Sequence, residues 1–209
     1  MRLVSTSSVG WLEEALAVLR EGGLVALPTE TVYGLAASLR TPAAVSRIFR
    51  LKNRAPDKAL PLQVASVEQA EGWGFRLDGG ARRLARAFWP GPLTLVLPRP
   101  RACPSWFAPG SPALGLRIPD HPAALSLLVA WGEPLAVTSA NRSGEPGCLD
   151  GASVAALFPR EPLLLAIDAG RAAGGVASTV VNATGAEPGI LREGPIARDR
   201  VEEVWHGRG

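Results

Sequence analysis

Apolar residues recur along the chain in two patterns, one typical of helices and one of short buried strands. In the first helical segment the apolar positions 11, 12, 15, 16 and 19 share one face, and Gly22-Gly23 ends the pattern. Capping residues and a proline at a first helical position predict further helices. The predicted helices run from about 9 to 20, from a Thr41 cap to about 52, from an Asp78 cap to 88, from an Asp120 cap past Leu125, Leu128 and Val129, from an Asp150 cap to about 158, and from about 199 to 205.

Short apolar runs between these helices predict strands. They cover residues 24–27, 60–64, 93–97, 114–117, 135–138, 163–167, 178–181 and 190–192, and residues 99–110 are a predicted loop. Helices interleaved with strands predict an α/β fold in which helices cover both faces of a sheet. The helix-free stretch from 178 to 192 indicates that part of this sheet is antiparallel. Because no repeat or low-complexity linker interrupts the sequence, we expect a single domain over residues 1–209.

Composition narrows the class of protein. Hydrophobic residues make up 47% of the chain, which excludes a disordered protein, and 23 glycines with 19 prolines argue against an all-helical bundle. Cys103 and Cys148 are the only cysteines, too few for a disulfide scaffold. The sequence has no signal peptide and no apolar run near the ~20 residues that span a bilayer. We therefore expect a cytoplasmic protein without a membrane partner.

The charge balance permits several partners. Twenty-two basic and 19 acidic residues give a net charge of +3, which allows contact with nucleotides or RNA without requiring it. Lysine occurs only at positions 52 and 58, in a chain that otherwise uses arginine. Either these lysines do something that arginine cannot, or codon bias explains them.

Several common catalytic motifs are absent from the sequence. It contains no Walker-type phosphate loop, no Gly-x-Gly-x-x-Gly after a strand and no Gly-x-Ser-x-Gly elbow. His121 and His206 are the only histidines, and neither has a second metal ligand nearby in sequence. We therefore predict no metal site, a structural or rim position for His121, and a surface position for His206.

Polar and cationic residues gather where the predicted strands end, which is where α/β sheets bind ligands. Each of them alone could also be a turn residue or a solvated charge. The residues in question are Thr29 and Tyr33, Lys52 and Arg54, Arg117, Thr138, Ser139, Asn141, Ser178, and Arg192. Lysine and arginine with short neutral donors suit a polyanion together with a carboxylate. The pattern thus favours nucleotide chemistry.

Seven segments in order carry a specific resemblance. They are Pro28-Thr-Glu-Thr-Val-Tyr-Gly-Leu35, Lys52-x-Arg54, Trp89-Pro-Gly-Pro-Leu-Thr94, Arg117-x-Pro-x-His-Pro122, Ser139-Ala-Asn-x-Ser-Gly144, Ser178-Thr-Val-Val181 and Ile190-Leu-Arg192. From about Gly22 to Ile196 the chain resembles the threonylcarbamoyl-AMP synthases of the YrdC type. The resemblance implies a twisted, open mixed sheet with a central positively charged cleft.

The same resemblance implies an activity. It is the synthesis of L-threonylcarbamoyl adenylate from L-threonine, bicarbonate and ATP, with release of pyrophosphate. The product would serve tRNA threonylcarbamoyl transferase proteins, which modify the adenosine beside the anticodon. Direct contact with tRNA would be weak. Mg²⁺ would enter on the phosphates of ATP, since no acidic pair is evident to hold it.

The resemblance also implies roles for single residues. Lys52, Arg54, Ser139 and Asn141 match the signature residues of the family and would be catalytic and nucleotide-binding. Ser178 and Arg192 match the nucleotide side, and Thr29, Tyr33, Arg117 and Thr138 match positions near the threonine. Catalysis would rest on positioning and electrostatics, because cations must bring two anions together.

The chain departs from the family pattern at a few positions. Ala55 stands where proline is common, Lys58-Ala59-Leu60 where Asn-Pro-Leu is common, Gln63 where many members have histidine, and Glu193 where many have proline. These departures affect the lining of the pocket more than the reaction. Long members carry a second domain, so the chain resembles the short form.

Two other functions remain open at this stage. One is the carbamoyl-transfer domain of hydrogenase maturation proteins, which usually occurs with zinc-finger and acylphosphatase-like domains. The other is an RNA-binding module that uses the basic cleft without catalysis. Such a module usually interleaves aromatic with basic residues, whereas here aromatics make up only 6%.

Overall fold

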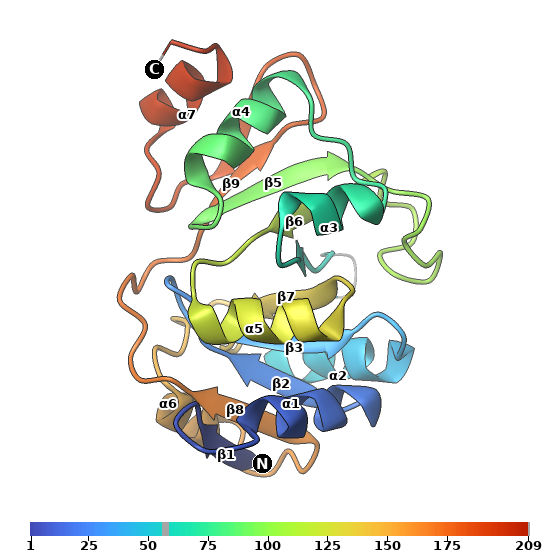
Figure 1. Ribbon diagram of the computed structural model, residues 1–209, viewed down its shortest axis with the longest axis vertical. Coiled ribbons are helices and arrows are strands. Elements are labelled where there is room, and N and C mark those ends of the chain that lie inside the picture. Colours follow the sequence, from blue (N-terminus) through green and yellow to red (C-terminus); the bar gives the residue numbers. More distant parts are fainter. Residues whose placement is uncertain (56–58, 209) are drawn as a thin grey trace.

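The computed structural model describes residues 1–55 and 59–208, and in this part of the chain ten strands form one continuous sheet (Figure 1). The strands are β1 (Arg2–Ser5), β2 (Leu24–Leu27), β3 (Gly34–Ser38), β4 (Leu62–Gln63), β5 (Leu93–Pro98), β6 (Ala113–Arg117), β7 (Leu135–Ser139), β8 (Leu164–Asp168), β9 (Thr179–Asn182) and β10 (Gly189–Arg192). The helices are α1 (Trp11–Arg20), α2 (Pro42–Lys52), α3 (Val67–Gly72), α4 (Gly79–Phe88), α5 (Pro122–Trp131), α6 (Gly151–Leu157) and α7 (Arg198–Trp205).

The sheet is mixed, as predicted. Its order is β1-β8-β2-β3-β7-β4-β6-β5-β9-β10, so the two termini lie at opposite ends of the molecule. The pairs β1/β8, β2/β8, β4/β6 and β5/β9 are parallel, and the other pairs are antiparallel. The antiparallel β9/β10 pair confirms what the helix-free stretch predicted.

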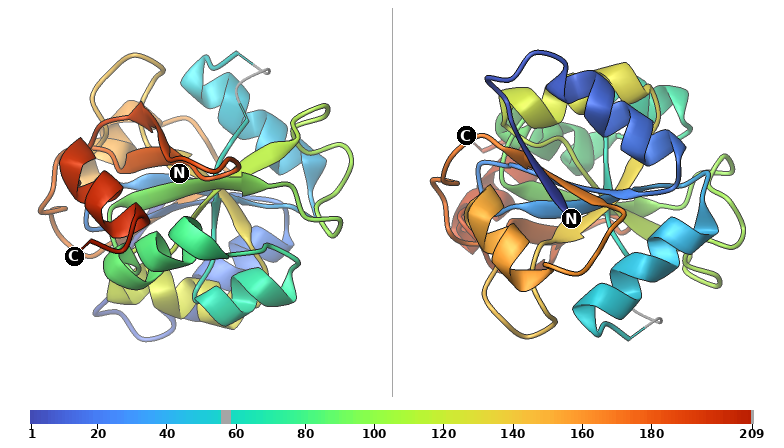
Figure 2. Two further views of the ribbon diagram at one scale, coloured as in Figure 1. Left: turned by 90° about the horizontal axis from the view of Figure 1, so that it is seen from above. Right: turned by 90° about the horizontal axis from the view of Figure 1, so that it is seen from below.

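Helices cover both faces of the sheet, which also confirms the prediction (Figure 2). On one face α1 and α5 bury their apolar sides, with Leu19 and Leu127 fully enclosed against the strands. On the other face α2 contributes Ile48 to a second and larger core. At the C-terminal end α7 packs on α4, where a Cβ at Gly80 would collide with the Trp205 ring. These layers leave the middle of the sheet as the place where a cavity can form.

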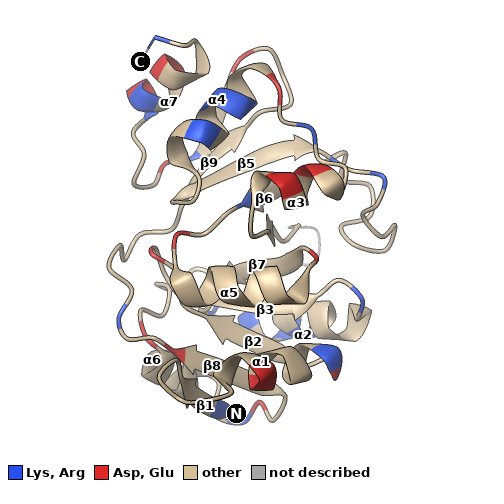
Figure 3. Cartoon of the chain, in the orientation of Figure 1, with Lys and Arg blue, Asp and Glu red and all other residues tan. Residues whose placement is uncertain are grey.

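Charged residues of opposite sign meet on helices α3 and α4. Figure 3 shows acidic positions on α3 beside basic positions on α4. Arg82 of α4 pairs with Glu71 of α3, and both side chains are well exposed. Exposed pairs of this kind contribute little to stability, on the order of 1 kcal/mol or less. Among the described residues, no helix is both long and apolar enough to cross a membrane.

The predicted helix starts are partly correct. Asp150 caps α6 as expected, because its Oδ1 accepts a hydrogen bond from Ser153 N at 2.7 Å. The predicted Asp120 cap is wrong by one residue, since His121 is the N-cap of α5 and its Nδ1 accepts from Ala123 N at 3.2 Å. Thr41 and Asp78 occupy N-cap positions, but neither side chain makes the capping bond.

Other expectations need correction for physical reasons. Val129 is one of the apolar residues that predict its helix, yet it is 67% exposed, while Ala124, Leu127 and Leu128 fill the buried face. Strand β3 was missed because its small residues, Gly-Leu-Ala-Ala-Ser, give no strand signal although all five are buried. Strand β1 and the six-residue helix α3 were also missed, being too short for a clear period.

Candidate functional site

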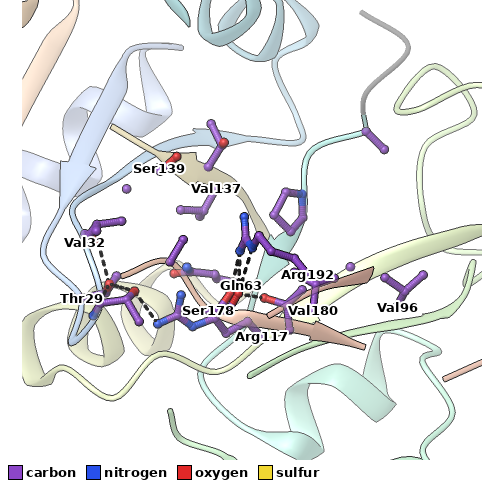
Figure 4. Close-up of a pocket in the computed structure, with 18 of the residues that line it drawn as sticks. Thr29, Val32, Gln63, Val96, Arg117, Val137, Ser139, Ser178, Val180 and Arg192 are labelled. Atoms are coloured by element: carbon purple, nitrogen blue, oxygen red, sulfur yellow. Dashed lines mark hydrogen bonds between the residues drawn. The ribbon is translucent and has the colours of Figure 1, made fainter. Parts of the chain in front are cut away.

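One face of the central sheet forms the floor of a cavity of about 370 Å³ (Figure 4). Side chains alternate between the two faces of a strand, so residues paired across strands share a face. The register pairs Gly34 with Ser139, Gln63 with Arg117, Gly115 with Val96, and Val180 with both Thr94 and Arg192. All of these residues line the cavity. The sheet register therefore assembles the site from seven strands far apart in sequence.

Two glycines of the cavity floor, Gly34 and Gly115, leave space open because they carry no side chain. A Cβ at Gly34 would lie 2.7 Å from Val137 Cγ1, too close for any real contact. A Cβ at Gly115 would lie 3.1 Å from both Pro61 Cβ and Thr94 Cγ2. Larger residues at these positions would fill the space that a ligand needs.

The cavity has a polar side and an apolar side. In Figure 4, Thr29 lies at one end of the lining and Val96 at the other. The apolar lining includes Ala59, Pro61, Val96, Ala113, Gly115 and Val180, and Val32, Gly34, Val137 and Ala177 also line the cavity. The polar lining includes three arginines, at positions 54, 117 and 192. Such a cavity can hold a flat apolar ring at one side and anionic groups at the other.

Arg117 is held in place by its neighbours. It is 7% exposed, its Nε donates to Gly91 O at 3.1 Å, and its Nη2 donates to Glu30 Oε1 at 2.6 Å and to Thr31 Oγ1 at 2.9 Å. Burial lowers the pKa of Arg117, and the Glu30 carboxylate opposes that shift. Nη1 makes no hydrogen bond to the described residues, so one edge of the fork remains to bind a ligand.

Arg192 is attached to the opposite wall. Its Nε and Nη2 donate to Ser178 O at 3.0 and 2.8 Å, and Ser178 Oγ is 2.8 Å from Thr94 Oγ1. Partial burial, and then the positive charges of Arg117 and Arg54, lower the pKa of Arg192. Arg192 is therefore close enough to Arg117 and Arg54 to be repelled by both. An anion bound among them would relieve that repulsion.

Lys52 and Asn141 do not line the cavity but lie behind its wall. Lys52 is 1% exposed, and its Nζ donates to Ser139 O at 2.5 Å, Asn141 O at 2.9 Å and Asn141 Oδ1 at 2.5 Å. Burial, and then the positive charge of Arg54, lowers the pKa of Lys52 to about 8. Ser139 Oγ donates to Asn141 Oδ1 at 2.6 Å. Lys52 thus fixes the turn that carries Ser139 into the cavity.

Tyr33 and Thr29 shape the polar end. Tyr33 is fully buried; its hydroxyl donates to Gly170 O at 2.8 Å and accepts from Ala169 N at 3.2 Å. Burial raises its pKa. Thr29 Oγ1 donates to Val32 O at 2.6 Å and contacts Thr31 Oγ1 at 2.8 Å. The Tyr33 bonds join the loop before β3 to the segment that follows β8, and the Thr29 bonds hold that loop in shape.

The structure brings together most of the residues that the sequence singled out. Eight of the ten line the cavity, namely Thr29, Tyr33, Arg54, Arg117, Thr138, Ser139, Ser178 and Arg192. The residues that sequence reasoning missed are Glu30, Thr31 and Thr94, all of which lie within the quoted segments. The sequence does not reveal the apolar lining, because residues such as Ala113 and Gly115 have the composition of any buried strand.

The departures from the family pattern fall in different places. Gln63 lines the cavity and is 6% exposed. Ala55 and Glu193 are exposed and do not line it, and Glu193 pairs with Arg198 at 3.4 Å. Lys58 lies outside the described residues. Ala59, which stands where proline is common, also lines the cavity, so the departures at positions 59 and 63 are the ones that meet a ligand.

The site holds no protein-borne metal cluster within the part of the chain that the structure describes. No group of three or more His, Cys, Asp and Glu side chains is placed there to bind an ion. The described lining of the cavity also includes no carboxylate. A cation in this cavity would therefore have to be held by the ligand and by water.

Comparisons with known proteins agree with one another. A family model described as telomere recombination, covering Sua5, YciO and YrdC, matches residues 17–194. The chain is 41% identical over 190 residues to a threonylcarbamoyl-AMP synthase of Pyrococcus abyssi, covering 91% of this chain but 56% of that protein's length. It is 36% identical to a putative threonylcarbamoyl-AMP synthase of Mycobacterium tuberculosis, covering 91% of this chain and 87% of the relative.

A solved structure supports the same grouping. The crystal structure of Pyrococcus abyssi Sua5 complexed with L-threonine superposes with a TM-score of 0.87 at 38% identity. The match covers 97% of this chain and 60% of that one. The cavity described above thus lies in a fold shared with a protein that binds L-threonine.

Proposed function

The chain belongs to the Sua5/YciO/YrdC family, and on that premise we propose that it makes L-threonylcarbamoyl adenylate from L-threonine, bicarbonate and ATP, releasing pyrophosphate. The observation that carries the proposal is the lining of one cavity by three arginines beside an apolar strip. The arginines suit phosphates and a carboxylate, and the strip suits a nucleobase.

The two ends of the cavity divide the substrates between them. We assign the carboxylate of threonine to Arg117 Nη1, near Thr29 and Tyr33. We assign the phosphates of ATP to Arg54 and Arg192, and the adenine to the strip that contains Pro61 and Val96. With this division, the amine of threonine faces the α-phosphorus of ATP across the floor of the sheet.

The reaction then proceeds in two steps. The amine of threonine combines with bicarbonate to give a carbamate and water. A carbamate oxygen attacks the α-phosphorus, and pyrophosphate leaves with the electrons of the broken P–O bond. Both partners are anions, so the main task of the protein is to offset charge and fix geometry. Arg54 and Arg192 offset the phosphate charge, and Ser139 Oγ positions an oxygen.

Lys52 and Asn141 act in this proposal as positioning residues. Their contacts hold Ser139 from behind, and the buried Nζ is saturated by three oxygens. The sequence suggested instead that Lys52 offsets phosphate charge and that Asn141 positions an oxygen of the nucleotide. Any Mg²⁺ would be held by the phosphates of ATP and by water, and would add charge neutralisation to that of Arg54 and Arg192.

The product defines the partners. An acyl adenylate is a mixed anhydride, which must be passed to a nucleophile before water destroys it. We propose tRNA threonylcarbamoyl transferase proteins as the acceptors and only weak direct contact with tRNA. A cytoplasmic location and a single domain over residues 1–209 stay predictions.

Product identity tests the proposal. The protein is incubated with ATP, L-threonine and ¹³C-bicarbonate, and the mixture is analysed at once by mass spectrometry. We expect a threonylcarbamoyl adenylate that is one mass unit heavier than the product made with unlabelled bicarbonate. An unlabelled adenylate, or none, would contradict the proposal. In separate incubations, RNA binding without any adenylate would favour the binding module, and transfer of a carbamoyl group from an added carbamoyl donor would favour the hydrogenase-type relative.

A further inference from the structure

A second hollow, of about 420 Å³, lies apart from the cavity of the central sheet and is rich in arginine. Its arginines come from three separate segments: Arg50 from the last turn of α2, Arg142 from the turn after β7, and Arg160 from the loop between α6 and β8. Helices α2 and α6 lie on the same face of the sheet (Figure 2). No described residue lines both spaces, so the hollow is a separate feature of the surface.

The positive charge of this hollow is not offset by the protein. All three arginines are exposed, and none of their side chains bonds or pairs with another residue in the part of the chain that the structure describes. The lining also includes one carboxylate, that of Glu161, but its Oε1 lies 3.6 Å from Arg47 Nε in a pair that is largely buried. Three guanidinium groups therefore surround the hollow with their donors unspent.

A helix end explains only part of this cluster. A cation in the last turn of a helix interacts favourably with the helix dipole, which accounts for Arg50 at the end of α2. Arg142 lies in a turn, where no such benefit exists. The convergence of three arginines from distant segments on one hollow therefore points to a ligand.

The chemistry of the lining indicates the class of that ligand. Guanidinium groups bind phosphate and carboxylate oxygens through paired hydrogen bonds. Three of them around one small hollow suit an anion that carries several charges close together, as a chain of phosphate groups does. The carboxylates of an acidic peptide lie on separate side chains and are spread more widely. Leu51 and Leu157 add an apolar part to the lining, which leaves room for an organic group beside the phosphates.

The hollow adjoins the segments that hold Ser139 in the cavity. Arg50 lies two residues before Lys52, and Arg142 directly follows Asn141. The two segments are already joined by the Lys52 contacts with Asn141 and by the bond from Ser143 N to Lys52 O at 2.8 Å. An anion bonded to both Arg50 and Arg142 would bridge the same two segments from outside.

We propose that this hollow is a second anion site, which binds a compact chain of two or more phosphate groups and thereby stabilises the turn that carries Ser139. The inference goes beyond the proposed function, since these arginines do not line the cavity in which the reaction is placed. Free pyrophosphate and the phosphate chain of a nucleotide share the required chemistry.

Calorimetry with inorganic pyrophosphate tests the inference. Because the cavity also binds phosphates in the proposed function, the titration uses Arg192→Met, which weakens that site. In this protein we expect pyrophosphate to bind in the hollow. Adding Arg50→Gln or Arg142→Gln should weaken that binding by about tenfold or more, the loss typical of one charge-assisted contact. The altered side chains are exposed, so the variants should fold, and a thermal melt checks this.

Arg86 provides a matched control. It lies in the last turn of α4, as Arg50 does in α2, and it is exposed and lines neither space. Arg86→Gln makes the same change of charge, and we expect it to leave pyrophosphate binding unaltered. An equal loss in Arg86→Gln and Arg142→Gln would mean that only the net charge matters, which would overturn the inference.

Hydrogen exchange tests the effect on the turn. In Arg192→Met, pyrophosphate should slow exchange of the Ser143 amide, whose bond to Lys52 O joins the two segments. The slowing should disappear when Arg50→Gln and Arg142→Gln are added together. Exchange at Ser143 that does not respond to bound pyrophosphate would contradict the proposed stabilisation.

Two further ligands identify the source of the phosphates and the class of partner. ADP that binds more tightly than pyrophosphate, in a manner that depends on Arg142, would assign the site to a nucleotide; equal affinities would assign it to the free phosphate chain. A glutamate-rich peptide that binds there more tightly than either would overturn the inference in favour of a protein-docking surface, as would unchanged pyrophosphate binding in the folded variants. Phosphate binding in the hollow without any adenylate synthesis would refute the proposed function and leave this inference standing.

Discussion

The Nζ of Lys52, at the end of α2, lies 2.5 Å from Asn141 Oδ1 and 2.9 Å from Asn141 O, in the turn after β7. Three N–H groups of the ammonium meet three oxygens, counting Ser139 O. A compact ammonium fits this arrangement, whereas a planar guanidinium is wider and directs its donors differently. This contact explains why lysine occurs here in a chain that otherwise uses arginine.

Loss of this contact should impair turnover more than binding. We expect Lys52→Met to lower kcat by ~10²–10³, the range typical for one preorganised electrostatic group, with little change in the KM for ATP. Lys52→Arg should recover only part of the activity, because the guanidinium does not fit the three oxygens. Steady-state kinetics and a thermal melt of each variant provide the check. Wild-type kinetics in both variants would mean that Lys52 is dispensable to the site.

The pH dependence of stability should report the same buried charge. The pKa of Lys52 is about 8 in the folded chain and 10.5 in its usual range. Between pH 8 and 10.5 the lysine is protonated in the unfolded chain and neutral in the folded chain, so the free energy of unfolding rises with pH. Below pH 8 the folded chain buries a charged ammonium, and the resulting destabilisation is fully present. The wild type should gain roughly 3 kcal/mol relative to Lys52→Met between pH 7.5 and 10.5. Denaturant melts that move in parallel for both proteins would refute the buried charge.

Arg117 should affect threonine and leave ATP alone. Arg117→Met removes a charge-assisted bond to a carboxylate, which is worth ~1.5–3 kcal/mol, so the KM for threonine should rise about ten- to a hundredfold. The same change leaves the carboxylate of Glu30 without its partner, 2.6 Å away in the wild type. Adding Glu30→Gln should therefore restore stability without restoring the KM for threonine. An effect on ATP alone would place Arg117 on the phosphate side.

Arg192 should show the opposite split. It lies on the edge strand β10, so Arg192→Met is expected to fold normally and to raise the KM for ATP about tenfold while leaving the KM for threonine unchanged. Leu191→Ala, on the same strand, is the matched control, since Leu191 is 63% exposed and does not line the cavity. Equal kinetic effects in both variants would show that the strand, and not the guanidinium, matters.

Much of the fold could be predicted from the sequence because its signals are local. Proline at position 42 and the apolar spacing behind it predicted α2 with its observed ends, and the run 24–27 is β2 as predicted. Cap identity at α5 was wrong because aspartate is a preferred cap and histidine is not, although Pro122 at the first helical position makes His121 the cap. The order of the strands involves pairings between distant segments, which local patterns do not encode.

The site was predictable for residues of distinctive chemistry and not for the rest. Arginines at strand ends stood out, and the three that line the cavity had all been named. Lys52 was expected among the phosphates because its charge is visible in the sequence while its burial is not. Gly115 and Val96 gave no signal, since their role comes from the pairing of β5 with β6.

Pyrophosphate release with each substrate omitted in turn tests the central claim most directly. If one cavity holds ATP and the carbamate of threonine together, release should require ATP, L-threonine and bicarbonate at once, and should fall to background when any one of them is left out. Rates that persist without threonine or without bicarbonate would contradict the account, because the α-phosphorus would then be attacked by something other than the carbamate.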